Sequence, residues 1–151
     1  MKVRTELINF ADGITLDSGD RLENFELMIE TYGELNESGS NAILLCHAFS
    51  GNHHAAGKNK ESEIGWWDEI VGPNKAIDTD KYYVVCCNNL GGCGGSSGPT
   101  TINPSSEKPY GKNFPQISVK DWVNTQKMLR DKVGGPYWHL VAGGSLGGMQ
   151  A

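Results

Sequence analysis

The chain contains 151 residues with 38% hydrophobic and 21% charged side chains, a composition that fits one globular domain with a sizeable core. Its formal net charge of −5 gives no electrostatic reason to expect nucleic acid or an anionic membrane as a partner. The N-terminus carries no apolar stretch of signal-peptide length, and the longest apolar run, 42–46, is far shorter than the roughly 18 residues that span a membrane. We therefore expect a cytoplasmic protein.

Four segments are predicted to form strands. The first begins with alternating polarity and ends at a turn at Gly33, and a polar turn at 36–41 separates it from the second. The other three are short, continuous apolar runs, which are typical of strands buried on both faces of a sheet. In chain order the four segments are 25–32, 42–46, 82–87 and 139–142.

A helix is predicted between the last two strands. Ser118 is a suitable N-cap, and Asp121 stands at the position that closes a capping box. Gly134, Gly135 and Pro136 end the helix. The residues at helical spacing, of which only Gln126 is polar, are Val119, Trp122, Val123, Gln126, Leu129 and Val133. Buried strands that alternate with a helix predict an α/β fold with a mostly parallel sheet and flanking helices. In such folds ligands bind beyond the carboxyl ends of the strands.

The last predicted strand leads directly into a Gly-x-Ser-x-Gly pattern centred on Ser145. A serine on a sharp strand-to-helix turn needs a strained backbone angle, and small residues two positions before and after it avoid clashes. This order of strand, Gly-x-Ser-x-Gly and helix is that of the nucleophile elbow in the α/β-hydrolase fold. Ser145 is therefore the predicted nucleophile.

The oxyanion-binding groups are predicted to be two backbone N–H groups. One belongs to Leu146, the residue after the nucleophile, and the other comes from a loop that follows an earlier strand. The loop after the strand 42–46 fits that requirement, and Phe49 is the expected donor. We expect His47, which begins this loop, to cap the strand end and to have no catalytic role.

No histidine of the chain is expected to act as the catalytic base. His139 lies six residues before Ser145 on an extended strand, roughly 20 Å away. His53 and His54 are adjacent on a polar loop, where we expect them to be solvated, and no metal-ligand spacing surrounds them. In this fold the triad runs in the order Ser, Asp or Glu, His, so both partners are expected after residue 151.

Two further patterns argue against other chemistry. The Gly-rich segment 91–98 follows a strand but lacks the Gly-Lys-Ser/Thr ending of a phosphate-binding loop, so we expect it to shape the mouth of the active site. The cysteines form no Cys-x-x-Cys pair, and we interpret them as reduced, mostly buried thiols without zinc. The two adjacent ones should face opposite sides of a strand. The four are Cys46, Cys86, Cys87 and Cys93.

The sequence resembles the homoserine O-acetyltransferase family of the α/β-hydrolase superfamily, from about Phe25 onward. It departs from the family pattern at Phe49, where leucine is frequent, at Leu146, where methionine is frequent, and at Gly94, where the family has a bulkier residue. The first two residues act through backbone N–H groups, so their predicted roles survive. The stretches that carry the resemblance are 47–51, 54–57, 65–68, 72–80, 89–93, 98–99, 102–104, 108–111 and 143–150.

The resemblance implies a ping-pong acyl transfer without metal or cofactor, in which acetyl-CoA is a co-substrate. Ser145 would take the acetyl group, with the oxyanion bound by Phe49 and Leu146, and the hydroxyl of L-homoserine would then accept it, on the route to methionine. Family members are typically cytoplasmic homodimers with a helical lid after this region. Residues 1–151 are then expected to be the N-terminal part of a single core domain, truncated just after the elbow, with an incomplete triad and no activity by itself.

Several alternatives remain open at this point. A succinyl donor, or serine as the acceptor, would fit the same family. A carboxylic-ester hydrolase would use the same elbow with water as the acceptor. A third possibility, from a different class, is that the polypeptide is a non-catalytic fragment or a binding module.

Overall fold

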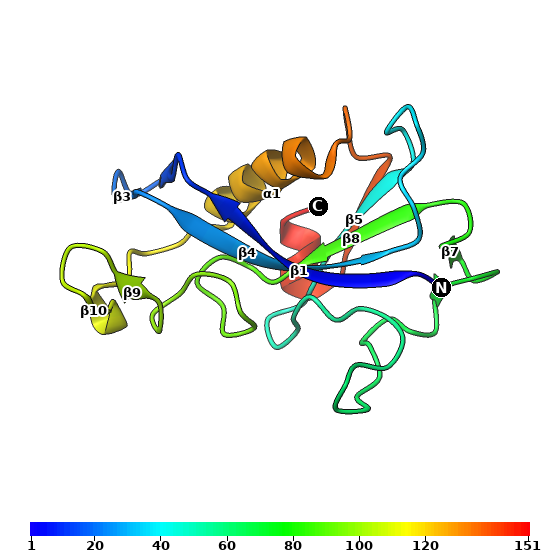
Figure 1. Ribbon diagram of the computed structural model, residues 1–151, viewed down its shortest axis with the longest axis horizontal. Coiled ribbons are helices and arrows are strands. Elements are labelled where there is room, and N and C mark those ends of the chain that lie inside the picture. Colours follow the sequence, from blue (N-terminus) through cyan, green and yellow to red (C-terminus); the bar gives the residue numbers. More distant parts are fainter.

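The computed structural model describes residues 1–151 and is built around a five-stranded sheet with one long helix across one of its faces (Figure 1). The spatial order of the strands is β1-β4-β8-β5-β11. Their bounds are β1 Val3–Phe10, β4 Phe25–Tyr32, β5 Ala42–Cys46, β8 Tyr83–Cys87 and β11 Leu140–Gly143. The four predicted strands are therefore present, with shifts of one residue at β8 and β11.

The sheet is mixed, although its central part is parallel as predicted. Strands β8, β5 and β11 pair in parallel, whereas β4 pairs antiparallel with both β8 and β1. Strand β1 was not predicted, because most of its side chains are exposed and it has no buried apolar stripe. The chain returns from β1 to β4 through a small two-stranded ribbon, β2 Ile14–Thr15 and β3 Arg21–Leu22. A return without a crossover helix makes the pair antiparallel.

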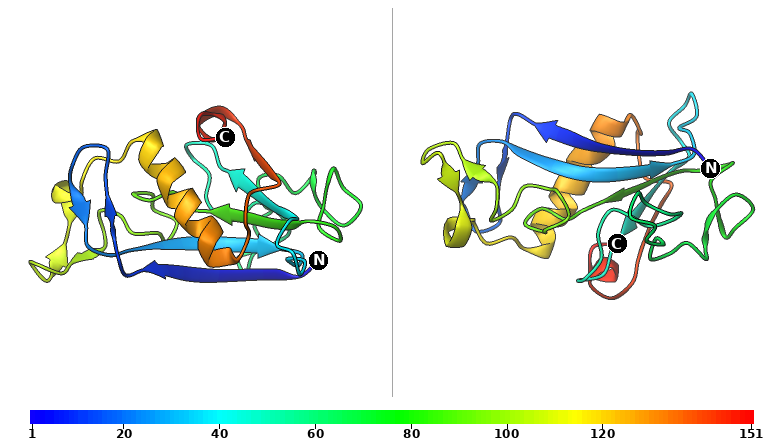
Figure 2. Two further views of the ribbon diagram at one scale, coloured as in Figure 1. Left: turned by 90° about the horizontal axis from the view of Figure 1, so that it is seen from above. Right: turned by 60° about the horizontal axis from the view of Figure 1, so that its bottom comes forward.

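Hydrophobic cores lie on both faces of the sheet. Every residue of β5 is buried, as the continuous apolar run predicts. The adjacent Cys86 and Cys87 belong to different cores, which confirms that they face opposite sides. The core with Cys87 also contains Leu129 of α1, and the core with Cys86 contains residues from the segment between β5 and β8, such as Val71. Figure 2 shows α1 on one side of the sheet and much of that segment on the other.

The single α-helix, α1, spans Val119–Val133 with the predicted ends. The Ser118 side chain accepts a hydrogen bond from the Asp121 N–H, and the Asp121 carboxylate accepts one from the Ser118 N–H. Gly134 has φ +88°, a left-handed conformation that ends the helix. The buried face is more polar than the apolar spacing predicts: its buried residues are Asp121, Thr125, Gln126 and Leu129. No helix in the structure has the length and apolar character needed to cross a membrane.

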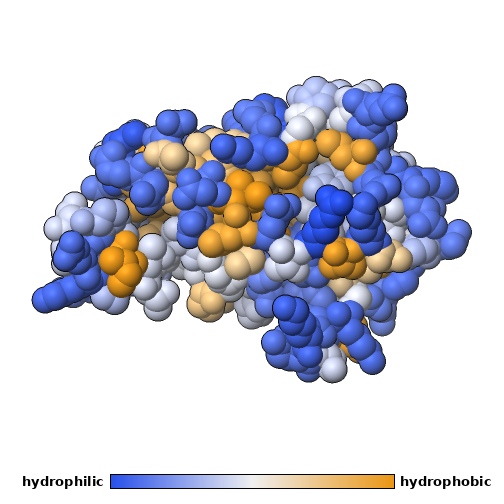
Figure 3. All heavy atoms as spheres, in the orientation of Figure 1, coloured by the Kyte–Doolittle hydropathy of each residue, from blue (hydrophilic) through white to orange (hydrophobic).

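The remaining elements are short. They are β6 Val71–Gly72, β7 Ile77–Asp78, β9 Ile102–Asn103, β10 Lys108–Pro109, and the 3₁₀ helices η1 Gly111–Asn113 and η2 Ser145–Met149. On the face drawn in Figure 3, hydrophilic residues dominate the periphery, and hydrophobic residues show mainly towards the middle of the molecule.

Candidate active site

The segments that carry the predicted site residues leave the same edge of the sheet side by side. Strand β11 runs parallel to β5, and its last residue, Gly143, pairs with Cys46 at the end of β5. The loop after β5 therefore starts next to the turn that contains Ser145. A Cβ atom placed on Gly147 would lie 2.0 Å from the Cys46 carbonyl oxygen and 3.0 Å from that of His47. The two segments are thus in direct backbone contact.

Ser145 has the strained backbone that the Gly-x-Ser-x-Gly pattern predicts. Its φ is +56°, in the left-handed region that serine rarely adopts, and it is the first residue of η2. The glycines two positions away are required by space: a Cβ on Gly143 would lie 2.5 Å from backbone atoms of Gly147, and one on Gly147 would overlap Cys46. Gly144 has no such neighbour within 4 Å. The turn therefore presents an exposed Ser145 and tolerates no side chain at positions 143 and 147.

The Ala48 carbonyl and the Phe49 N–H form one peptide group, and hydrogen bonds to the carbonyl fix the orientation of that group. The Ala48 carbonyl accepts hydrogen bonds from His47 Nδ1, at 2.7 Å, and from the Gly51 N–H, at 2.9 Å. In a planar trans peptide the N–H points away from the carbonyl, so the Phe49 N–H is directed away from both of these donors. The Phe49 side chain is 87% exposed. The loop therefore has a defined backbone direction and an exposed aromatic residue.

His47 has the structural role that the sequence predicts. The Asn89 N–H, just after β8, donates to His47 Nε2 at 3.2 Å, so the ring proton is on Nδ1, where it is donated to Ala48. Burial lowers the pKa of His47, which keeps the ring neutral. Both ring nitrogens are therefore used in holding the loop after β5.

The expectation that His54 is solvated is wrong. Its side chain is buried, with Nδ1 2.9 Å from Glu30 Oε2 and Nε2 3.2 Å from the Glu63 carbonyl oxygen. Glu30 lies on β4, and burial raises the pKa of its carboxyl group, an effect that His54 partly opposes. The neighbouring His53 is half-buried, and desolvation lowers its pKa. A partner on a distant strand explains why the local sequence did not reveal this pair.

Tyr32, also on β4, supports the same loop. Its hydroxyl oxygen accepts hydrogen bonds from the N–H groups of Ala55, at 2.7 Å, and Ala56, at 3.0 Å. Glu30 and Tyr32 are two residues apart and lie on one face of the strand. That spacing was the one available signal in the sequence for this buried polar cluster.

The Gly-rich segment 91–98 is fastened along β4. Ser96 Oγ accepts from the Met28 N–H and Ser97 Oγ accepts from the Glu26 N–H, each at 2.9 Å. These hydroxyl groups are occupied in a backbone role, which fits a shaping loop better than a phosphate cradle. Gly94 packs tightly, since a Cβ there would lie 2.3 Å from Asn88 Oδ1.

The other candidate residues are placed as follows. His139 packs against Tyr82 with the rings tilted and their centroids 5.3 Å apart, at the opposite end of β11 from Ser145. All four cysteines are free thiols, three of them buried and Cys93 exposed.

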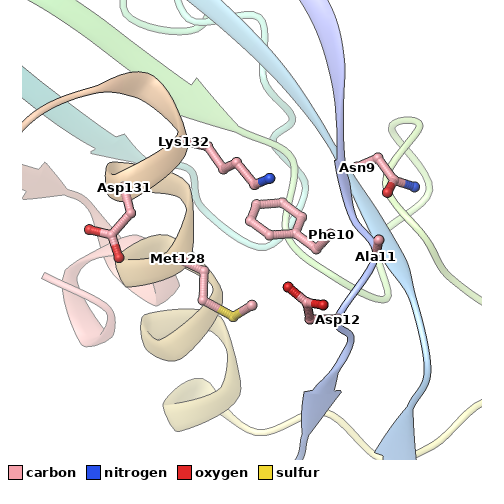
Figure 4. Close-up of a pocket in the computed structure, with 7 residues that line it drawn as sticks. All are labelled: Asn9, Phe10, Ala11, Asp12, Met128, Asp131 and Lys132. Carbon is pink, nitrogen blue, oxygen red and sulfur yellow. The ribbon is translucent and has the colours of Figure 1, made fainter.

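A cavity of about 420 Å³ lies between the end of β1 and α1, lined by Phe10, Met128 and Lys132 among others (Figure 4). Because β1 and β11 are opposite edges of the sheet, this cavity is not part of the site around Ser145.

The comparisons with known proteins agree with this fold. The model of the family described as alpha/beta hydrolase fold matches residues 41–151. A homoserine O-succinyltransferase of Psychrobacter arcticus is 54% identical over 99% of the chain, and one of Alkalilimnicola ehrlichii is 55% identical over 99%. The chain spans 34% and 39% of the lengths of these two proteins, respectively.

Two solved structures are also similar. The homoserine O-acetyltransferase from Bacillus anthracis has a TM-score of 0.92 and 37% identity, over 100% of this chain and 42% of its own. Esterase E22 has a TM-score of 0.91 and 40% identity, over 99% of this chain and 43% of its own. The resemblance predicted from the sequence motifs and the predicted fold class are both confirmed.

Proposed function

The chain belongs to the α/β-hydrolase fold family, and from this premise we propose that it carries the nucleophile and the oxyanion-binding groups of a homoserine O-acyltransferase. The observation that carries the proposal is the conformation of Ser145, with φ +56°, between two glycines that have no room for a side chain. Backbone strain of this kind is maintained by the surrounding structure and clusters at functional sites.

The proposed reaction has two steps. The Ser145 hydroxyl attacks the thioester carbonyl of an acyl-CoA, the carbon–sulfur bond breaks, and CoA leaves as the thiol with the proton taken from serine. The hydroxyl of L-homoserine then attacks the Ser145 ester, which releases O-acylhomoserine and returns the proton to serine. In each step the N–H groups of Phe49 and Leu146 stabilise the oxyanion of the tetrahedral intermediate.

A general base is needed in both steps, and the proposal assigns it to no residue of this chain. The Ser145 hydroxyl makes no hydrogen bond with a histidine or carboxylate among residues 1–151, and the nearest histidine in the chain order, His139, is at the far end of β11. In this fold the acid and the histidine follow the nucleophile in sequence. The triad is therefore incomplete in residues 1–151, and these residues alone are expected to be inactive.

The proposal also has to name the acyl donor, which is either succinyl-CoA or acetyl-CoA. The two curated relatives are named for a succinyl donor, whereas the Bacillus anthracis enzyme is named for acetyl. The higher identity to the succinyltransferases favours succinyl-CoA over the acetyl-CoA expected from the sequence. The product places the reaction in methionine biosynthesis. A cytoplasmic location and a homodimer stay predictions of the family resemblance.

Ester hydrolysis is a second candidate because esterase E22 is 40% identical over 99% of the chain. The same acyl-enzyme would form, and water in place of homoserine would release the acid. The elbow and the oxyanion donors serve both reactions equally. What distinguishes the two is the group that discharges the acyl-enzyme.

The test uses the full-length gene product. It is incubated separately with succinyl-CoA and acetyl-CoA without an acceptor, and the covalent adduct is located by intact mass and peptide mapping. We expect a succinyl adduct on Ser145 that L-homoserine discharges faster than L-serine or water. The Ser145→Ala variant is the matched control and should take no adduct. An unmodified Ser145, together with full activity of Ser145→Ala, would remove the proposed nucleophile, whereas discharge by water alone would assign an esterase.

A further inference from the structure

Gln126 is the one polar residue among the apolar positions of α1, and it is not solvated. Its side chain is 3% exposed, and its Nε2 donates to Gln150 Oε1 at 2.6 Å. Gln150, just after η2, is 5% exposed. This amide pair is the direct side-chain hydrogen bond between the helix that covers the sheet and the segment that contains Ser145.

The pair continues to the residue after the nucleophile. Gln150 Nε2 donates to the Leu146 carbonyl oxygen at 3.4 Å. The two glutamines therefore connect α1 and the turn at 145–149 in one buried chain of hydrogen bonds.

This connection acts where the backbone is strained. Ser145 is held at φ +56°, and the next peptide must present the Leu146 N–H to the reacting carbonyl. The N–H and the carbonyl of Leu146 lie on either side of the same Cα atom. A carbonyl held by Gln150 therefore limits rotation of the backbone that carries the Leu146 N–H. An unpaired buried amide is costly, so each glutamine constrains the other.

We infer that Gln126 and Gln150 are positioning residues for acyl transfer, which hold Leu146 and Ser145 in the reactive arrangement. The inference rests on the proposed function of Ser145. Neither glutamine touches the substrate. Their loss lowers the rate of acyl transfer to Ser145 and leaves the binding of acyl-CoA unchanged.

The first test measures single-turnover acylation of the full-length gene product by the better of the two acyl-CoA donors. Gln126→Met and Gln150→Met keep side-chain length and remove the amide. We expect the acylation rate to fall at least about tenfold and KM for the acyl-CoA to stay within about twofold, because misplacement of reacting groups affects the chemical step. Thr125→Val is the matched control: Thr125 is buried next to Gln126, but its hydroxyl bonds only to the Trp122 carbonyl within α1.

The double variant Gln126→Met/Gln150→Met separates positioning from stability. It leaves no unpaired amide of the pair, so its thermal midpoint should recover towards wild type relative to the single variants. Its acylation rate should stay low, because the bond to the Leu146 carbonyl is missing. Recovery of both quantities together would show a purely structural pair and overturn the inference.

A third variant reverses the bond without changing shape. At a pH at which the new carboxyl group is ionised, Gln126→Glu cannot donate to Gln150 Oε1, so the Gln150 amide turns its NH₂ group towards the carboxylate and releases Leu146. We expect slow acylation together with faster amide hydrogen exchange in the peptide that covers 143–150. If wild type is acylated on Ser145 and the variants match its rate, the inference alone falls. If wild type is never acylated there, the proposed function falls first.

Discussion

The N–H group of Asn89 donates to Nε2 of His47 over 3.2 Å, and this bond ties the loop after β5 to the end of β8. It also determines the tautomer of His47, whose proton must then be on Nδ1 and bonds to the Ala48 carbonyl at 2.7 Å. The Ala48 carbonyl and the Phe49 N–H belong to one peptide group. A backbone bond at the end of one strand therefore orients the proposed oxyanion donor at the end of its neighbour.

Replacement of His47 by phenylalanine should impair the reaction more than it impairs substrate binding. The substitution keeps a flat ring and removes both hydrogen bonds, so the Ala48–Phe49 peptide loses one of its two fixed donors. We expect kcat of the full-length gene product to fall by at least about tenfold, less than the roughly hundredfold to thousandfold loss seen when one oxyanion donor is removed, because the donor is misoriented and still present. KM for the acyl-CoA should change little. A wild-type kcat in His47→Phe would contradict the assignment of Phe49 as a donor.

His47 should also make folding stability depend on pH. Burial lowers its pKa in the folded state from the ordinary value of 6.5, so below that value the unfolded chain binds a proton that the folded chain does not. The contribution of His47 is therefore fully present above about pH 6.5 and is lost as pH falls towards the folded-state pKa. Urea unfolding of wild type and His47→Phe from about pH 7 to about pH 5 measures the difference. The variant should lose less stability over this range, and equal losses would contradict the prediction.

Local sequence patterns predicted the parts of the fold that depend on local physics. The continuous apolar run 42–46 is wholly buried as β5, and Ser118 with Asp121 forms the predicted capping box. The strained turn at Ser145 was likewise predictable from the Gly-x-Ser-x-Gly pattern, although the contact that requires Gly147 is with Cys46, at the end of a distant strand. In each case the signal lies within a short segment of the sequence.

The unpredicted features depend on partners far apart in the chain. Most side chains of β1 are exposed, so its sequence has no apolar stripe, and the strand is identified by its pairing with β4. His54 is buried because Glu30, 24 residues earlier, faces it from β4. In the sequence, Gln126 is a polar residue in an otherwise apolar helical stripe. Its burial is explained by the hydrogen bond to Gln150, which lies beside it only in the folded structure. A single sequence does not show which residues form such pairs, since their proximity is produced by the tertiary fold.

Tyr32→Phe should destabilise the protein through backbone groups and not through packing. The Tyr32 hydroxyl accepts from two N–H groups, Ala55 and Ala56, and the side chain is fully buried. Removal of the hydroxyl leaves these donors without a partner, which costs about 1–3 kcal/mol of unfolding free energy. The matched control is Tyr137→Phe, at a residue that is 51% exposed. Urea unfolding of both variants checks this, and equal midpoints would contradict the role of the hydroxyl.

Cys93 should be the reactive thiol of this region. It is exposed, while the other three cysteines are buried, and burial raises the pKa of Cys46 and Cys87 to about 12. The thiolate is the nucleophile in alkylation, so burial disfavours both reagent access to Cys46 and Cys87 and their ionisation. Brief treatment of the native protein with iodoacetamide, followed by peptide mapping, should label Cys93 alone among these four. Labelling of Cys46 under native conditions would show that the end of β5 opens readily.

Gly144 and Gly147, which precede and follow Ser145, should differ sharply in their tolerance of alanine. At Gly147 a Cβ would lie 2.0 Å from the Cys46 carbonyl oxygen, a distance that forces η2 away from β5. At Gly144 nothing lies within 4 Å of the added atom, and its φ of −114° is ordinary for alanine. We expect Gly147→Ala to abolish acylation of Ser145 or prevent folding, and Gly144→Ala to keep at least about half of the wild-type stability and rate. Circular dichroism and single-turnover acylation measure both. An active Gly147→Ala enzyme would mean that the close approach of the turn to β5 is not needed for the reaction.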